Sequence, residues 1–367
     1  SNMFVDRKQS GGISHFLVAE PRVNATLNLL DSRNNPVFDL LALTGGFGIS
    51  NKMPTLMYLY PDYAYFDNAS LSKYGTETKD RLGLITTDVV KNPDLRPARS
   101  TKWEAGLSFR INRIKGFATF FHESHRHELG FTSQLIWQNY DKYTVPATAT
   151  DPVFDAASGD VTYRVDGTEH TALRTKTTEM YTWSRAANST TTHKHGIEYG
   201  LDFGEIKPLH TSLNISGAWF HIKRKNENMP LYYINSSFDY VGVLPSGGGN
   251  LRDRFNSTFR LITHIPAIKM VFTTSVQVVW YESTQTIYED ENGNSRYYLK
   301  SYEDKDYLVV DPVGYYDKQG HYTAWSQADA DDADKSRIMY RTQPYLYEKD
   351  VIKPWALLLS LIHISEP

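Results

Sequence analysis

The 367-residue sequence contains no cysteine, and this absence removes one group of functions at once. Without cysteine there is no disulfide framework, no thiolate metal site and no cysteine nucleophile. The sequence also lacks any run of about 18 consecutive apolar residues, which excludes a transmembrane helix. The formal net charge is −3 and no basic tract is present, so nucleic acid is not expected as the main partner.

Aromatic residues, by contrast, are abundant, with 25 tyrosines, 17 phenylalanines and 7 tryptophans. Such an excess in a polar chain is typical of β-strands, of sugar-binding surfaces and of the aromatic girdles of membrane barrels. The mean hydropathy of −0.47 is compatible with a barrel, because a barrel turns only every second residue toward lipid. No secretory signal follows Ser1. We therefore expect either a cytoplasmic protein or a fragment that starts inside a longer one.

Alternation of polar and apolar residues is the dominant pattern of the chain. Apolar residues occupy the odd positions of 22–30 and of 103–111, and polar residues occupy most of the even ones. This period of two predicts strands with one apolar and one polar face. A charged face is costly in a packed core but not in a water-filled lumen. We expect the lumen to be lined by polar positions such as Lys102, Glu104, Ser108 and Arg110.

Further strands, each about 10 to 16 residues long and thus longer than usual in soluble proteins, are expected along the rest of the chain. They are Phe38–Ile49, Phe117–His127, His193–Glu205, Leu209–Arg224, Leu251–Thr263 and Ile268–Ser283. The connections alternate between short turns, at 31–36, 112–116, 205–208 and 264–269, and long segments, at 50–99, 128–191, 225–250 and 284–353. This pattern predicts an all-β fold, an antiparallel transmembrane β-barrel with short periplasmic turns and long extracellular loops.

The segment Asn92–Pro97, followed by Ser100–Leu107 (STKWEAGL), resembles a strand start in the C-terminal barrel of TonB-dependent outer-membrane receptors of the Bacteroidota type. Ala98 departs from the Glu that is common there. Gly48–Leu56, with the Tyr58–Pro61 stretch after it, is similar to the segment that follows an ascending strand in this family. The resemblance covers most of residues 12–350.

The resemblance implies a 22-stranded barrel around a plug that moves with energy from the TonB complex. This chain provides about nine of those strands, so we expect residues 1–367 to be a partial barrel, with the plug missing upstream and the final strands missing downstream. Residues 360–367 look like translated sequencing-adapter read-through, which indicates a metagenomic fragment. The implied partners are outer-membrane lipid and lipopolysaccharide, the TonB complex through the missing plug, and a surface lipoprotein.

Four tyrosines in the first long segment are the candidate ligand-binding residues: Tyr58, Tyr60, Tyr63 and Tyr65. Aromatic rings that face an outer vestibule stack on sugars or hold aromatic ligands. The alternative is that these rings pack the loop onto its neighbours or sit in the girdle.

For two other clusters, the sequence favours a position in the girdle or in a solvated loop over a metal site. His122, His125 and His127 at the end of one strand, with His193 and His195 at the start of the next, are either a metal site or girdle positions near the rim. Residues 329–334 contain four aspartates without the Gly and Glu of an EF-hand, which favours a solvated loop over a calcium site.

No nucleophile, base and orienting group can be assembled from the sequence, so we expect neither an enzyme nor a bound cofactor. The leading hypothesis is an outer-membrane receptor that imports a bulky nutrient such as an oligosaccharide, a peptide or a metal chelate. A passive outer-membrane porin and a secreted carbohydrate-binding β-sandwich remain as alternatives.

Overall fold

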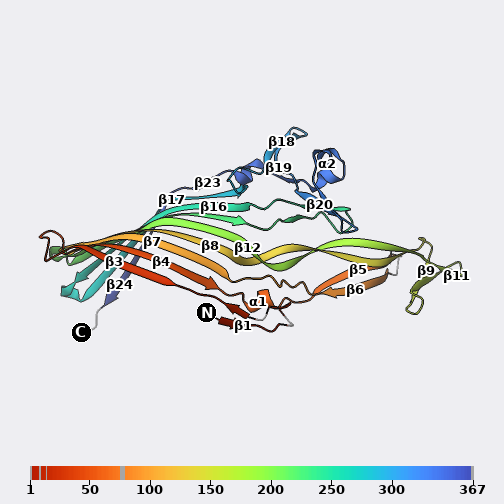
Figure 1. The fold of residues 1–367 in the computed structure, drawn as a ribbon, viewed down its shortest axis with the longest axis horizontal. Helices are drawn as coiled ribbons and strands as arrows, with labels where there is room; N and C mark the ends of the chain where they lie inside the picture. Colours follow the sequence, from red (N-terminus) through yellow and green to blue (C-terminus); the bar gives the residue numbers. More distant parts are fainter. Residues whose placement is uncertain (1, 8–9, 14, 75–78, 365–367) are drawn as a thin grey trace.

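A computed structural model describes residues 2–7, 10–13, 15–74 and 79–364. The fold is all-β, with 67% of residues in strands and 7% in helices, and its sheets are antiparallel (Figure 1). Its largest unit is a ten-stranded sheet in the order β3-β4-β7-β8-β12-β13-β16-β17, in which β23 and β24 both pair with β17. In the described part of the chain, no helix is long and apolar enough to cross a membrane.

The strands of the ten-stranded sheet are long, and β8 and β12 are the longest. They are β3 (Arg22–Asp31), β4 (Leu40–Lys52), β7 (Ala98–Ile111), β8 (Ile114–Thr144), β12 (Leu173–Ile206), β13 (Thr211–Asn226), β16 (Gly248–Ile265), β17 (Met270–Tyr288), β23 (Asp350–Ile352) and β24 (Trp355–Ile364).

The described chain also contains smaller sheets and single-turn helices. The smaller sheets contain β1 (Asn2–Phe4) with β2 (His15–Leu17); β5 (Ala64–Tyr74) with β6 (Lys79–Asp88); β9 (Thr150–Asp155), β10 (Asp160–Val165) and β11 (Thr168–Thr171); β14 (Leu231–Tyr232), β15 (Tyr240–Val243), β20 (Gly314–Asp317) and β21 (Tyr322–Ala324); and β18 (Tyr298–Tyr302), β19 (Lys305–Val310) and β22 (Tyr340–Thr342). The helices are α1 (Leu56–Leu59), α2 (Gln327–Asp331) and the 3-10 turns Lys207–Leu209, Pro266–Ile268, Lys335–Ile338 and Pro344–Tyr347.

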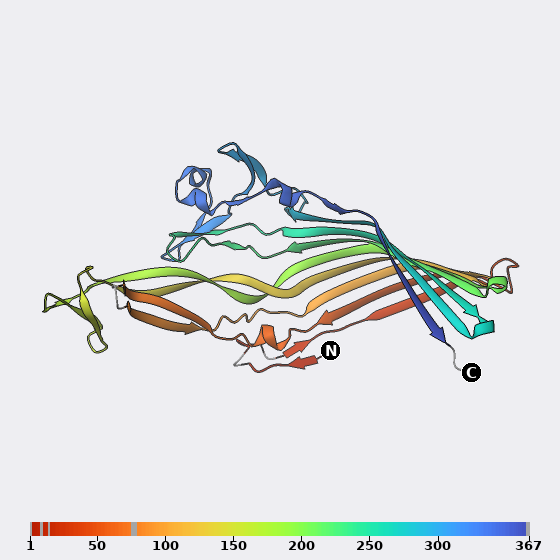
Figure 2. The same cartoon turned by 180° about the vertical axis from the view of Figure 1, so that it is seen from behind.

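Successive strands of the ten-stranded sheet are joined by short turns at one end and by long connections at the other (Figure 2). The turn between β7 and β8 is the tightest, and Asn112 adopts a left-handed conformation in it. His210 and Lys269 adopt the same conformation where the 3-10 turns before β13 and β17 end. The predicted alternation of short and long connections is thus present in the fold.

The prediction of a long loop over 128–191 is wrong. β8 continues to Thr144 and pairs with Leu173 of β12, so this connection is shortened to 145–172 and itself contains β9, β10 and β11. The alternation of polar and apolar residues predicted strands that are too short, because beyond the apolar segment both faces of the hairpin carry polar residues. Side-chain hydrogen bonds stabilise this outer part of the hairpin. Tyr140 and Tyr181, for example, both donate at 2.7 Å to the carboxylate of Glu179.

The buried core lies mainly where the long connections meet the β8–β12 hairpin. Leu59 and Leu95 of the first long connection pack in one cluster with Ala186 of β12. Phe66 of β5 packs in a second cluster with Ile136 of β8. The connections are therefore ordered by apolar contacts of their own, whereas the short-turn half of the sheet contributes little to these clusters.

Candidate functional site

The ten-stranded sheet has two faces of different chemistry, and the strand register places each residue on one of them. Directly paired residues share a face. One face carries mostly apolar residues: Leu41, Leu43, Phe47, Trp103, Leu107, Phe109, Phe120, Ile197, Leu201, Ile215, Trp219, Phe255, Phe259, Leu261, Phe272, Val276 and Val278. The other carries mostly polar ones: Thr44, Lys102, Glu104, Ser108, Arg110, Lys115, Thr119, Glu198, Asp202, Asn214, Ser216, Asn256, Thr258, Arg260, Ser275 and Gln277. We call them the apolar face and the polar face.

The apolar face forms a band that is limited in height. On β7 it runs over the nine residues from Trp103 to Ile111, which is roughly 26 Å along the strand at about 3.3 Å per residue. Toward the long connections it gives way to a row in which His122, His195 and His221 stand side by side. Within the band Leu107 remains 42% exposed, because no other layer of the described chain covers it.

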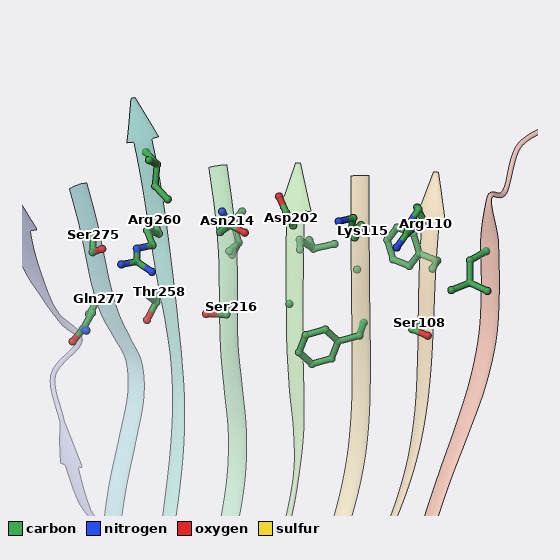
Figure 3. A pocket seen from close by; sticks show the side chains of 18 of the residues that line it. Ser108, Arg110, Lys115, Asp202, Asn214, Ser216, Thr258, Arg260, Ser275 and Gln277 are labelled. Carbon is green, nitrogen blue, oxygen red and sulfur yellow. The ribbon is translucent and has the colours of Figure 1, made fainter. Parts of the chain in front are cut away.

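A cavity of about 760 Å³ opens on the polar face, near the short turns (Figure 3). Two adjacent rows of paired residues line most of it. The first row crosses six strands through Arg110, Lys115, Asp202, Asn214, Arg260 and Ser275. The second crosses them through Ser108, Phe117, Gly200, Ser216, Thr258 and Gln277. We name them the basic row and the hydroxyl row.

The cations of the basic row have no ion-pair partner in the described part of the chain. Among the described residues, no ion pair within 4.0 Å involves Arg110, Lys115 or Arg260. Asp202 is the carboxylate of this row, and its Oδ1 accepts the backbone N–H of Gly204 at 2.8 Å. The cavity therefore offers guanidinium, ammonium, hydroxyl and amide groups to a polar solute.

The sequence predicted part of this lining. Ser108 and Arg110 line the cavity, as expected for polar positions of one strand. Lys102 and Glu104 lie on the same face but farther along β7, where they form an ion pair at 2.9 Å. The contributions of Lys115, Asn214, Arg260 and Gln277 were missed. The alternation within each strand indicates which face these residues occupy. The register between strands is also needed to show that they lie in one row.

The four candidate tyrosines fall into two groups. Tyr58 and Tyr60 pack against the cluster around Leu59, and the Tyr58 ring lies 5.3 Å from that of Phe131. The Tyr58 hydroxyl donates to a backbone carbonyl at 3.4 Å, and that of Tyr60 accepts a backbone N–H at 3.1 Å. Tyr63 and Tyr65 are instead 57% and 65% exposed, with ring centres 6.5 Å apart. A ligand contact by any of the four stays a prediction.

The histidines form a cross-strand stack above the apolar band. The ring of His195 lies 6.4 Å from that of His122 and 5.0 Å from that of His221. His221 Nδ1 and Asp253 Oδ1 are 2.8 Å apart. Within the described ranges, no group of three or more histidine or carboxylate side chains could hold a metal ion. His125 lies apart from this stack, and its Nε2 is 3.3 Å from Glu123.

The aspartates of the last long connection shape its backbone. The prediction of a solvated loop is wrong for Asp329, which is only 6% exposed and forms a capping box with Ser326 at the start of α2. Its Oδ1 accepts Lys335 Nζ at 2.7 Å, and its Oδ2 accepts Ser326 Oγ at 2.6 Å. Lys335, and after it Ser326, lower the pKa of Asp329 to about 2. The carboxylate is therefore ionised at neutral pH, while Asp331 remains exposed as expected.

No protein-family model, curated protein or solved structure matches the chain.

Proposed function

We propose that the chain forms part of the wall of a transmembrane β-barrel in a bacterial outer membrane. The apolar face of the ten-stranded sheet contacts lipid, and the polar face lines a water-filled lumen. The observation that carries this proposal is the uncovered apolar band, whose height on β7 is the nine residues from Trp103 to Ile111. A tilted transmembrane strand needs about 9–11 residues, so the band fits a bilayer.

The energetics of the apolar face support the same assignment. Side chains such as Leu43 at 44%, Leu107 at 42% and Trp280 at 44% keep much of their surface exposed. Full burial of one such side chain is worth about 1.5–3 kcal/mol, so a band of many of them would make the chain insoluble in water. Lipid removes that cost without a second protein layer.

The difference between the two ends of the sheet supports one orientation of the barrel in the outer membrane. In outer-membrane barrels the short turns face the periplasm and the long connections face outward. The long connections here carry ordered structure and exposed rings such as Tyr63 and Tyr65, as a capture surface requires. The lumen cavity lies at the opposite, short-turn end.

Within this class we propose an active import receptor for a bulky nutrient, either an oligosaccharide, a peptide or a metal chelate. The support is the resemblance of 92–107 to the strand start of TonB-dependent receptors. In that case energy reaches the barrel from the TonB complex through a plug, and a surface lipoprotein is a further partner. A passive porin shares the wall but needs neither plug nor TonB.

Experiments on the protein encoded by the complete gene test both parts of this proposal, the outer-membrane barrel and the TonB-dependent receptor. The protein is expected to fractionate with outer membranes, to require detergent for extraction, and to carry a plug with a TonB-contacting segment ahead of these residues. A water-soluble monomer obtained without detergent would contradict the barrel and favour a secreted β-sandwich. An outer-membrane protein without a plug would leave the barrel standing and assign the chain to the porins.

A further inference from the structure

We propose that the basic row binds the carboxylate groups of an acidic oligosaccharide and so makes the lumen selective for anionic sugars. This inference rests on the proposed function, because it assigns a solute to the lumen face. The row carries three cations, Arg110, Lys115 and Arg260, against one carboxylate, Asp202. Its formal charge is therefore +2, although the whole chain has a net charge of −3.

The placement of the cations is unfavourable without an anionic ligand. Arg110 and Lys115 are direct partners across β7 and β8, and like charges in such positions destabilise a sheet. Asp202 is the next partner of Lys115, but no ion pair within 4.0 Å forms between them, and Gly204 already donates to its carboxylate. An oxyanion between Arg110 and Lys115 would relieve their repulsion.

The spacing of the cations favours an oligomer over a small anion. From Arg110 on β7 to Arg260 on β16 there are four steps across the sheet. At about 4.8 Å per step, the Cα atoms of Arg110 and Arg260 are roughly 19 Å apart along the sheet. A chain with several carboxylates can reach both ends of the row, whereas a single phosphate or a monosaccharide reaches only one.

The hydroxyl row supplies the groups that a sugar needs besides its charge. Ser108, Ser216 and Thr258 offer hydroxyls, and Gln277 offers an amide, to the hydroxyls of a sugar ring. The ring of Phe117 lines the cavity and is 48% exposed, so an apolar sugar face can stack on it. Gly200, the cross-strand partner of Phe117, makes room for this ring, because a Cβ at position 200 would come within 2.5 Å of it.

Isothermal titration of the complete protein in detergent tests the proposal with three probes of similar length: tetragalacturonate, maltotetraose and tetraglutamate. We expect tetragalacturonate to bind at least about tenfold more tightly than the other two, with an affinity that falls as salt rises. Arg110→Gln and Arg260→Gln are each expected to weaken it about three- to tenfold, and Arg110→Gln/Lys115→Gln/Arg260→Gln to abolish the preference over maltotetraose.

Arg33→Gln is the matched control, because Arg33 is an exposed cation in the turn after β3, at the same end of the sheet but outside the cavity. It should leave the binding of tetragalacturonate unchanged. Equal binding of tetragalacturonate and maltotetraose, equal binding of tetraglutamate, or equal losses for Arg33→Gln and Arg260→Gln would each overturn the proposal. The detergent requirement of the same preparation reports on the proposed function separately, since it does not depend on Arg110, Lys115 or Arg260.

Discussion

Leu107→Arg is expected to destabilise the chain in mixed detergent–phospholipid micelles by about 2–4 kcal/mol. Leu107 occupies the middle of the apolar band on β7, between Leu43 of β4 and Ala118 of β8. In the proposed barrel, an arginine there would have to place its charge among acyl chains or bend away from the band, and both are costly near the bilayer midplane. Urea titrations of the complete folded protein, followed by tryptophan fluorescence, measure the shift in the free energy of unfolding.

Ser108→Arg is the matched variant for this prediction. Ser108 is the next residue along β7, but it faces the cavity on the polar side of the sheet. In the proposed barrel a cation there is hydrated, and its repulsion from Arg110 and Lys115 is the main cost, so we expect a loss of no more than about 1 kcal/mol. If Ser108→Arg proved as destabilising as Leu107→Arg, or if both were tolerated, the assignment of lipid and water to the two faces would be wrong.

Ser257→Ala is expected to have the second large effect. Ser257 is 3% exposed on the apolar face, where Trp280 Nε1 donates to its hydroxyl at 2.7 Å and the Tyr199 hydroxyl lies 2.6 Å from it. Gly217 makes this contact possible, because a Cβ at that position would come within 2.5 Å of the Tyr199 hydroxyl. Alanine would leave two polar groups without a partner in an apolar environment, at about 1–3 kcal/mol for each.

The same urea titration measures this loss, and Ser275→Ala provides the comparison. Ser275 lines the cavity on the polar face of β17, where its removal leaves no buried group unpaired, so a change of less than about 0.5 kcal/mol is expected. Equal effects of Ser257→Ala and Ser275→Ala would show that the hydrogen bonds of Ser257 lie in water and not against lipid.

The face of each residue within a strand could be predicted from the sequence. Trp103, Leu107 and Ile111 share one face and Ser108 and Arg110 the other because side chains alternate in any extended strand. The short turns were also predictable, since polar and turn-forming residues interrupt the alternation at 31–36 and 112–116.

The assembly of the site across strands could not be predicted. Arg110 and Arg260 lie 150 positions apart in the sequence, and only the register of four strand pairs puts them in one row. The extended β8–β12 hairpin was missed for a related reason, because its outer part is stabilised by hydrogen bonds and by packing of the long connections instead of by an apolar face. Packing of this kind also decides that Tyr58 is held in the loop while Tyr63 is exposed.

The absence of cysteine allows the most direct test of the central claim, which is that lipid covers the apolar face and water the polar face. Single cysteines are introduced at neighbouring positions of two strands, as Leu107→Cys and Ser108→Cys on β7 and as Ile215→Cys and Ser216→Cys on β13. In lipid-containing micelles, a water-soluble maleimide should label the cysteines at 108 and 216 at least about tenfold faster than those at 107 and 215, because thiols react as thiolates in water. Equal rates within each pair, or faster labelling at 107 and 215, would contradict the account.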